Sequence, residues 1–294
     1  MTTLQIGYPK SGNFWLYQIL QRILEYNGQE TSGFIQKHPI QNLAKDWELN
    51  YPEQSLIDMI DITDLQVSYR ISSIFRMPVE DFSEYLKETS HVWTHSPVCK
   101  RSGDVFNRFE KKVYIIRDPR DVVISASKYF CSDYMQKYFP QEEKEPEKYL
   151  EKHFDRIMEE WVWHVWDHLR LSKKFNIHIC FFEGFRGNFQ EELCQLLDYL
   201  EVDLSKEQRQ QLENAVSFKK LKQENPKHLR KGTSGYWKEQ LSQYHKERAI
   251  QLAGPLLGHL GYSGIKNSGL NRNFSHWDFE ALKEEIISAR QPLV

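Results

Sequence analysis

The sequence predicts an α/β fold in which a central parallel sheet is flanked by helices on both faces, giving three layers. Two observations lead to this fold class: short apolar runs typical of strands alternate with longer segments of helical periodicity, and the order strand, tight loop, helix occurs twice. Strands that alternate with helices favour βαβ crossovers, which pair the strands in parallel. Because no internal repeat, low-complexity tract or linker interrupts the chain, we expect one domain over residues 1–294.

Each element has its own signal in the sequence. Short apolar runs predict strands at Leu4–Gly7, His91–Thr94, Lys112–Ile116 and Ile177–Phe182. Apolar residues three or four positions apart predict helices. The helices run from Gly12 to a stop at Asn27–Gly28, over Val122–Lys128, over Tyr149–Lys174 and, within a C-terminal extension (residues 265–294), over Trp277–Arg290. Residues 132–152 are polar and interrupted by prolines, which is typical of a mobile lid or of a plain solvated connection.

The charge balance limits the function classes. The 294 residues include 39 Lys+Arg and 41 Asp+Glu, for a formal net charge of −2. A general nucleic-acid binder normally shows a basic excess gathered into a patch, so we expect no nucleic-acid partner. Any anion that this chain binds must be met by locally placed cations.

Cysteine usage and hydropathy predict a cytoplasmic protein. The four cysteines are scattered without a CxxC pair, which is typical of a reduced compartment. No signal-peptide pattern precedes the first motif. No apolar run approaches the roughly 20 residues that a membrane-spanning helix needs, so we expect no membrane association.

The first strand, loop and helix carry the sharpest motif, Tyr8–Trp15, with the sequence YPKSGNFW. Main-chain N–H groups of such a loop, together with the positive end of the following helix, form an anion site, and Lys10 adds a full charge. The motif differs from GxxxxGK[ST], and the strand Lys112–Ile116 leads into Arg117 instead of an acidic metal ligand. An ordinary nucleotide hydrolase is therefore disfavoured. The alternative interpretation is a simple turn with a surface lysine.

Two further segments offer polar groups at the same edge of the sheet. Arg117 follows a strand and Ser125 lies about two turns into the next helix, so both can face a ligand there. The alternative is a surface ion pair and a serine that bonds its own helix. The segment Arg230–Trp237 combines two adjacent cations with two glycines, which suits a loop that wraps a phosphate. Three such segments indicate a nucleotide with two separate phosphate groups.

These three motifs resemble those of the cytosolic sulfotransferase family, whose donor is 3′-phosphoadenosine 5′-phosphosulfate (PAPS). Tyr8–Trp15 resembles the family's YPKSGTxW, Arg117–Ser125 its RxxxDxxVS, and Arg230–Lys238 its RKGxxGDWK. Weaker similarities, such as Thr94–Pro97 to Thr-His-x-Pro and Phe182–Glu183 to Tyr-Glu, extend the resemblance from residue 4 to about residue 247. The resemblance implies a P-loop-like three-layer domain and an enzyme that releases 3′-phosphoadenosine 5′-phosphate (PAP).

The same resemblance implies a set of donor-binding residues. The first motif would hold the 5′-phosphosulfate end and the adenine side, and the second and third motifs would hold the 3′-phosphate. The residues so implied are Lys10, Ser11, Gly12, Asn13, Phe14 and Trp15 for the first motif, Arg117, Ser125, Arg230, Lys231 and Gly232 for the 3′-phosphate, Trp15 and Phe218 for adenine stacking, and Phe182 as a further donor contact.

The catalytic roles follow from the charge that develops during in-line transfer. The departing phosphate gains negative charge, which Lys10 is suited to stabilise. His95 would accept the proton of the acceptor as general base, although a lone histidine after a strand is more often structural. The family implies that Ser125 holds Lys10 until the acceptor binds. His164 and His168 are one helical turn apart but have no third ligand, so we expect no metal site.

Some positions depart from the family pattern. Asn13 and Phe14 replace hydroxyl-bearing residues, and Trp93 stands where the family often has a lysine, so one cation near the sulfonate is missing. Lys238–Glu247 only half matches the family's dimer element, and we expect a monomer or a homodimer. The extension 265–294 is expected to pack near the acceptor cavity or at a subunit contact.

The sequence therefore predicts a PAPS-dependent sulfotransferase acting on a hydroxyl or amine of a small-molecule acceptor. Two alternatives stay open: an ATP-using P-loop phosphotransferase, and a non-catalytic protein that binds PAPS or PAP. The acceptor is expected to lie near aromatic side chains from residues 31–91 and 132–160. These are Phe34, Trp47, Tyr51, Tyr69, Phe75 and Tyr134.

Overall fold

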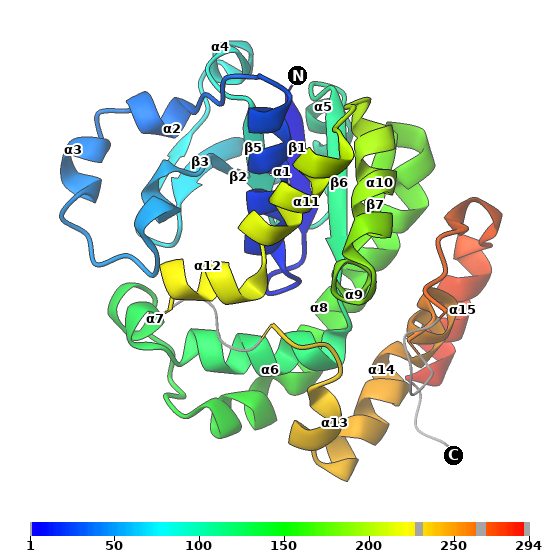
Figure 1. The fold of residues 1–294 in the computed structure, drawn as a ribbon. Coiled ribbons are helices and arrows are strands. Elements are labelled where there is room, and N and C mark those ends of the chain that lie inside the picture. The colour runs from blue at the N-terminus through cyan, green and yellow to red at the C-terminus, as the bar shows by residue number, and fades with distance from the viewer. Residues whose placement is uncertain (1, 227–231, 263–268, 291–294) are drawn as a thin grey trace.

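The computed structural model describes residues 2–226, 232–262 and 269–290, and the strands within them form one seven-stranded sheet (Figure 1). The strands are β1 (Thr3–Gly7), β2 (Met59–Ile62), β3 (Val67–Ile71), β4 (Phe75–Pro78), β5 (His91–Thr94), β6 (Lys111–Ile116) and β7 (Ile177–Phe181). Their order across the sheet is β4-β3-β2-β5-β1-β6-β7. The five neighbouring strands β2, β5, β1, β6 and β7 are parallel to one another. Strand β3 pairs antiparallel with both β2 and β4.

The four strands expected from the sequence are confirmed, and their parallel pairing with them. Strands β2, β3 and β4 were not expected. The reason is visible in their exposure: β4 is half-buried at its first residue and exposed at the other three, so it carries little hydrophobic signal. These strands are stabilised by pairing with neighbours distant in sequence, which local patterns do not report.

Helices cover both faces of the sheet. They are α1 (Asn13–Tyr26), α2 (Phe34–Lys37), α3 (Gln41–Ala44), α4 (Phe82–Lys87), α5 (Ser102–Phe106), α6 (Pro119–Phe130), α7 (Asp133–Tyr138), α8 (Pro146–Phe175), α9 (Phe182–Gly187), α10 (Phe189–Leu200), α11 (Lys206–Ala215), α12 (Phe218–Glu224), α13 (Trp237–Gln240), α14 (Gln243–Leu260) and α15 (Phe279–Ala289), with 3-10 helices η1 (Pro52–Leu56) and η2 (Phe274–His276). Among the helices of the described residues, none has both the length and the apolar content that crossing a bilayer requires.

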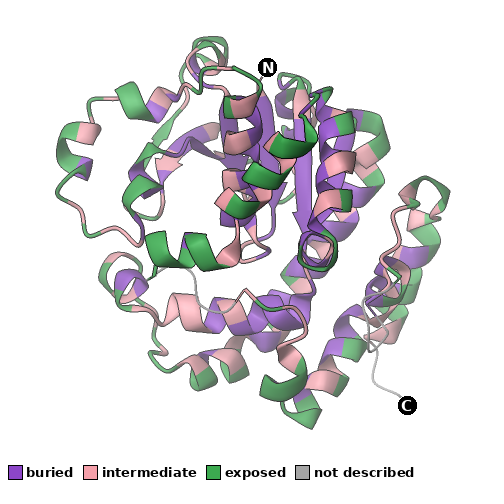
Figure 2. Cartoon of the chain, in the orientation of Figure 1, coloured by how far each residue is buried: buried purple, intermediate pink, exposed green. Residues whose placement is uncertain are grey.

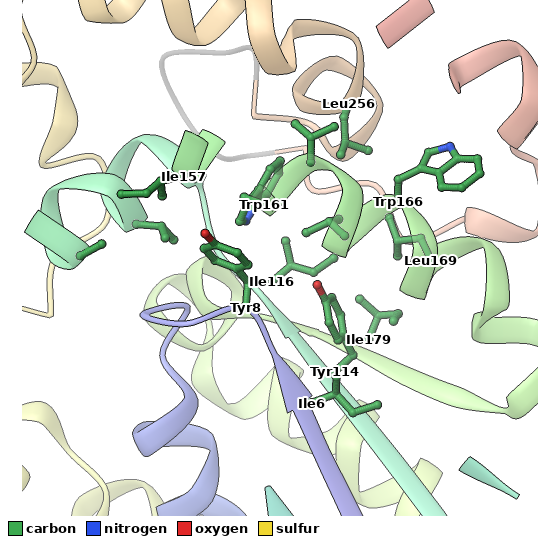
Figure 3. Packing of buried hydrophobic residues seen from close by; sticks show 14 of the residues in the cluster. Ile6, Tyr8, Tyr114, Ile116, Ile157, Trp161, Trp166, Leu169, Ile179 and Leu256 are labelled. Carbon is green, nitrogen blue, oxygen red and sulfur yellow. The ribbon is translucent and has the colours of Figure 1, made fainter. Parts of the chain in front are cut away.

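The alternation of side chains along β6 explains the three layers. Val113 and Ile115 pack into a core with α1, α10 and α11, whereas Tyr114 and Ile116 pack on the opposite face against α8 and α14. Figure 3 shows the second core, where Trp161 of α8 lies near Ile116, and Figure 2 shows the sheet as the most deeply buried part of the fold. Successive strand residues point to opposite faces, so a strand buried on both faces must be apolar throughout. The α/β, P-loop-like three-layer fold class is confirmed.

The segment 132–152 contains more regular structure than the two interpretations of it allowed. It forms α7 and the first turns of α8. Ser132 caps α7 by accepting a hydrogen bond from the N–H of Met135, and Pro146 occupies the first turn of α8, where its missing N–H costs nothing. Pro146 therefore marks a helix start, whereas Pro140 lies in the connection between α7 and α8.

The helix expected over Trp277–Arg290 is confirmed as α15, and it packs on the surface of α14 and α8. Leu282 and Ile286 are its buried residues, and the indole N–H of Trp166 in α8 donates to the carbonyl of Phe279 at 3.1 Å. Figure 1 shows α15 beside α14, at the margin of the fold. No residue of the described part of the extension lines the main cavity.

Candidate active site

The loop between β1 and α1 has a backbone that bends sharply at two residues. Lys10 has a φ of 69° and Gly12 a φ of 96°, both in the left-handed region. A Cβ at Gly12 would lie 2.5 Å from Cδ2 of Phe182, so only glycine allows this ring to approach the loop. The loop ends at the N-terminus of α1, where main-chain N–H groups and the helix dipole favour an anion.

Two polar side chains inside this loop behave differently. The amide of Asn13 donates to the carbonyl of Tyr8 at 2.8 Å, and that of Gln5 donates to the carbonyl of Asn13 at 2.7 Å, so Asn13 supports the shape of the loop. Ser11 is fully buried, and its Oγ has no hydrogen-bond partner among the described residues. A buried hydroxyl without a partner is costly, and an oxygen of a bound anion would satisfy it.

Arg117, at the end of β6, connects the first motif with the third. Its Nη1 donates to the carbonyl of Lys10 at 3.2 Å and its Nη2 to the carbonyl of Thr233 at 3.1 Å. The guanidinium lies 4.3 Å from the ring centroid of Phe182. Its buried Nε has no hydrogen-bond partner among the described residues, so this N–H group can donate to a bound anion.

The loop that carries the third motif packs against Phe218 and is anchored by Asp121. Gly232 has a φ of 56°, and a Cβ there would clash with the Phe218 ring. The carboxylate of Asp121 accepts hydrogen bonds from the N–H groups of Gly235 at 2.7 Å and Trp237 at 2.8 Å. Sequence reasoning missed this role, because a carboxylate in the first turn of a helix is explained by the helix dipole alone. Arg230 and Lys231 lie outside the described residues.

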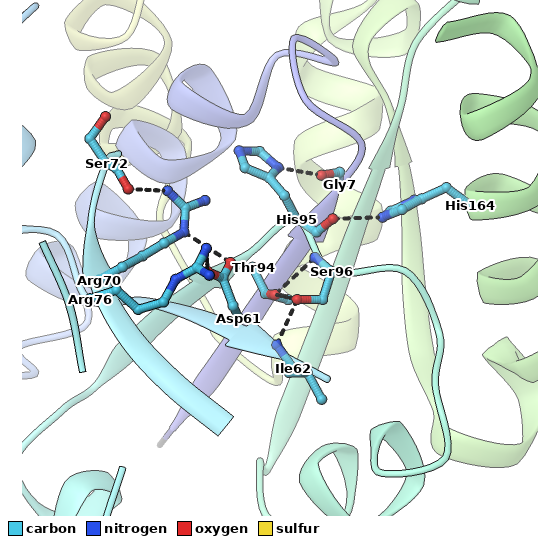
Figure 4. A network of polar contacts seen from close by, with 10 residues as sticks. All are labelled: Gly7, Asp61, Ile62, Arg70, Ser72, Arg76, Thr94, His95, Ser96 and His164. Atoms are coloured by element: carbon cyan, nitrogen blue, oxygen red, sulfur yellow. Dashed lines mark hydrogen bonds and ion pairs between the residues drawn. The ribbon is translucent and has the colours of Figure 1, made fainter. Parts of the chain in front are cut away.

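His95 follows β5, and its ring points toward the end of β1 (Figure 4). Its Nδ1 lies 2.6 Å from the carbonyl oxygen of Gly7. A carbonyl oxygen can only accept, so Nδ1 carries the hydrogen and Nε2 of the neutral ring has a free lone pair. Burial, with the positive charges of Arg70 and Lys10, lowers the pKa of His95 to about 3, against a bond to Gly7 that raises it. The geometry therefore presents a neutral imidazole with a free lone pair on Nε2, and the lowered pKa makes this ring a weaker base in the ligand-free protein than an exposed histidine.

His164 and His168 of α8 make hydrogen bonds near the end of β5. Nε2 of His164 donates to the carbonyl of His95 at 3.3 Å, and the hydroxyl of Tyr114 donates to its Nδ1 at 2.8 Å. His168 contacts the carbonyl of His164 through Nδ1 at 2.7 Å. Within the described residues, no group of three or more His, Cys, Asp or Glu could hold a metal ion.

A cavity of about 620 Å³ runs along this edge of the sheet, a size suited to small molecules. Lys10 reaches into it, with Nζ 3.9 Å from the ring centroid of Tyr129. Ser11, which is fully buried, is not among the lining residues. The expected site residues that line the cavity are Lys10, Gly12, Asn13, Phe14, Trp15, His95, Arg117, Ser125, Phe182, Phe218 and Gly232.

The other half of the cavity is formed by residues that sequence reasoning mostly missed. Of the six aromatic residues expected there, Tyr51 lines the cavity. Phe34, Trp47, Tyr69 and Phe75 pack against or within the core, and the hydroxyl of Tyr134 accepts a hydrogen bond from Gln54. The residues of this half include Asn50, Tyr51, Gln54, Met59, Arg70, Ser72, Trp93, Tyr129 and Met135. Two of them, Met59 of β2 and Arg70 of β3, lie on strands that no local pattern predicted.

Comparison with known proteins gives a consistent result. Residues 2–261 match the family model described as sulfotransferase domain. The chain is 27% identical over 263 residues to sulfotransferase 1 family member D1 of Mus musculus, covering 81% of this chain and 78% of the relative. It is 24% identical over 265 residues to the amine sulfotransferase of Oryctolagus cuniculus, covering 83% and 76%.

Solved structures share the fold. The mouse sulfotransferase SULT7A1 complexed with PAP has a TM-score of 0.58 at 17% identity, over 98% of this chain and 88% of that chain. A retinol dehydratase in complex with androsterone and PAP has a TM-score of 0.58 at 18% identity, over 87% and 80%. At these identities the likeness concerns the fold, whereas the family model covers most of the sequence. This chain belongs to the sulfotransferase family.

Proposed function

We propose that this chain transfers the sulfonate group of PAPS to a hydroxyl or amine of a small-molecule acceptor and releases PAP. The observation that carries the proposal is one cavity lined by Lys10, Arg117 and His95, in which the His95 ring has its hydrogen on Nδ1. Two cations suit a donor with two anionic ends, and an imidazole with a free Nε2 suits a general base. The family and the solved relatives that hold PAP support the choice of donor.

The residues present fit the donor on both of its anionic ends. The N-terminus of α1 and Lys10, which line the cavity, suit the 5′-phosphosulfate, and Ser11 is proposed as a further contact of this end. Arg117, with its unused Nε, suits the 3′-phosphate together with Ser125 and Gly232, and Arg230 and Lys231 are proposed to complete that end.

Adenine stacking is proposed at an aromatic group in the same cavity. Trp15 and Phe182 pack edge to face at 5.4 Å between ring centroids, and Phe218 lines the cavity nearby with the third motif. The indole N–H of Trp15 is used in a bond to the carbonyl of Val216 at 2.9 Å, which fixes the orientation of its ring. A planar base offers the π-face that such rings bind.

In the proposed transfer, His95 accepts the proton of the acceptor hydroxyl or amine on Nε2 while the acceptor forms its bond to sulfur. The bond from sulfur to the 5′-phosphate oxygen breaks, and Lys10 stabilises the charge that this oxygen gains. The products are the sulfated acceptor, PAP and a proton on His95, which then passes to solvent. Ser125, on the same cavity wall, is proposed to orient Lys10 before the acceptor binds.

The donor assignment is tested by calorimetric binding of PAP. Arg117→Ala is expected to weaken binding about 10- to 100-fold, because it removes a charged hydrogen-bond donor from a phosphate. The matched control is Arg22→Ala, since Arg22 forms a partly exposed pair with Glu25 at 2.6 Å on α1. Wild-type protein that does not bind PAP would overturn the assignment.

The reaction is tested with labelled PAPS and a panel of phenols, alcohols and amines. His95→Ala is expected to lower kcat about 10²- to 10⁴-fold while leaving the Kd for PAP unchanged. Donor binding without transfer to any acceptor would indicate a non-catalytic binder, and magnesium-dependent turnover of ATP would indicate a phosphotransferase.

A further inference from the structure

Arg70 of β3 is a cation of the cavity that the donor does not require. Its side chain is 15% exposed, its Nε donates to Asp61 at 2.9 Å, and its Nη1 donates to the carbonyl of Ser72 at 2.8 Å (Figure 4). Its Nη2 makes no hydrogen bond to the described residues, although Arg70 lines the cavity. Hydrogen bonds from Nε and Nη1 therefore fix the orientation of the guanidinium, and the N–H groups of Nη2 can donate to a ligand.

The charges around Arg70 do not cancel. Asp61 also pairs with Arg76, at 2.5 Å, so one carboxylate serves two guanidinium groups. Arg76 is 63% exposed and solvated, whereas Arg70 is mostly desolvated. The one carboxylate among the described cavity-lining residues is Asp121, which already accepts from two main-chain N–H groups. A positive charge is thus left facing the cavity without an acidic partner inside it.

The strand order places this charge on the acceptor side of His95. His95 follows β5, and the proposed donor residues follow β1 and β6, on one side of β5. Arg70 lies on β3, on the other side of β5. Arg70 pairs with Met59 in register, and Met59 pairs with Trp93, so the three side chains form one row on the same face. A molecule that reaches His95 from this side passes over the row.

The row combines one cation with apolar surface. Met59 and Trp93 belong to a small buried cluster with Phe14 and Tyr51, which also line the cavity. A guanidinium binds carboxylate, sulfate and phosphate groups through paired N–H donors. The apolar neighbours suit an aromatic or aliphatic body.

We infer that the acceptor carries an anionic group as well as its hydroxyl or amine, and that Arg70 binds that group. The inference rests on the proposed function, because it assumes that PAPS occupies one half of the cavity and the acceptor occupies the other half. Arg70 then determines specificity: it aligns the nucleophile with His95 and favours an anionic acceptor over its neutral counterpart.

The test measures the binding of 4-hydroxyphenylacetate and of its methyl ester by calorimetry, with PAP present. The acid is expected to bind at least tenfold more tightly than the ester. Arg70→Met should weaken binding of the acid at least tenfold and of the ester less than threefold, with the Kd for PAP unchanged. Arg76→Met is the matched control, because it removes the other partner of Asp61, and it should leave the acid-to-ester ratio within threefold.

Arg70→Lys keeps the charge without the planar fork, so it should retain part of the preference and provides a second variant if Arg70→Met unfolds. Wild-type protein that binds both probes equally or does not bind the acid, or an Arg70→Met variant that loses both probes equally, would overturn the inference. The binding assay needs no turnover. If the acid binds in an Arg70-dependent way but no sulfonate is transferred, the result contradicts the proposed function and still supports the anion site at Arg70.

Discussion

The Nδ1 nitrogen of His95 lies 2.6 Å from the carbonyl oxygen of Gly7, the last residue of β1. The bond crosses from the end of β5 to the neighbouring parallel strand, just before the loop that binds the donor in our proposal. The same strand end therefore orients both the base and the donor loop. Movement of the β1 end would disturb both, which links donor binding to the position of the base.

The ring of His95 should stay neutral in ligand-free protein at every pH above about 4, because burial and nearby cations lower its pKa to about 3. Above its pKa a histidine is unprotonated, so no titration is expected near pH 6.5. Side-chain NMR across pH 4 to 8 measures this, with His95→Gln identifying the signal. A His95 signal that titrates between pH 6 and 7 would contradict the structure.

Gly12→Ala should destabilise the protein and weaken PAP binding. The substitution places a side chain at a φ of 96° and brings its Cβ to 2.5 Å from the Phe182 ring. Gly28→Ala is the matched control, since Gly28 has a φ of 68° with nothing within 4 Å of an added Cβ. Both variants should lose about 1 kcal/mol from backbone strain, and Gly12→Ala should lose at least about 1 kcal/mol more from displacing the ring. Equal losses of unfolding free energy would mean that the Phe182 contact is unimportant.

Asp121→Asn should loosen the loop that carries the third motif. The carboxylate accepts two main-chain N–H bonds, and hydrogen bonds to a charged group contribute about 1.5–3 kcal/mol. We expect faster hydrogen exchange at the amides of Gly235 and Trp237 and a several-fold weaker affinity for PAP. Asp203→Asn, at an exposed position, should change neither. Unchanged exchange in Asp121→Asn would show that other contacts hold this loop.

Leu282→Ala in α15 should cost about 2–5 kcal/mol of unfolding free energy, because Leu282 is 1% exposed against the core. Ile287→Ala, on the same helix but 39% exposed, should cost less than about 1 kcal/mol. Denaturant unfolding measures both. A single cooperative transition in wild type would support one domain over 1–294, and a separate early transition removed by Leu282→Ala would show that the extension folds apart.

The sequence by itself determined the elements whose signals are local. The strand Leu4–Gly7, the loop with Lys10, the following helix and the position of Arg117 at a strand end all follow from hydrophobic period and loop composition within short stretches of chain. Such patterns work because a strand buried on both faces must be apolar, and a helix must bury one side. The motifs placed on these elements consequently appeared where expected.

Tertiary structure alone decided which distant residues meet. Arg70 gained its place beside the cavity only through the pairing of β3 with β2, and β3 has no strong hydrophobic signal of its own. The proton position on His95 depends on Gly7, 88 residues away in sequence, and the anchoring of the third motif depends on Asp121, 114 residues from Gly235. Hydrogen bonds and charges act over a few ångströms in space, and the topology of the sheet sets those distances.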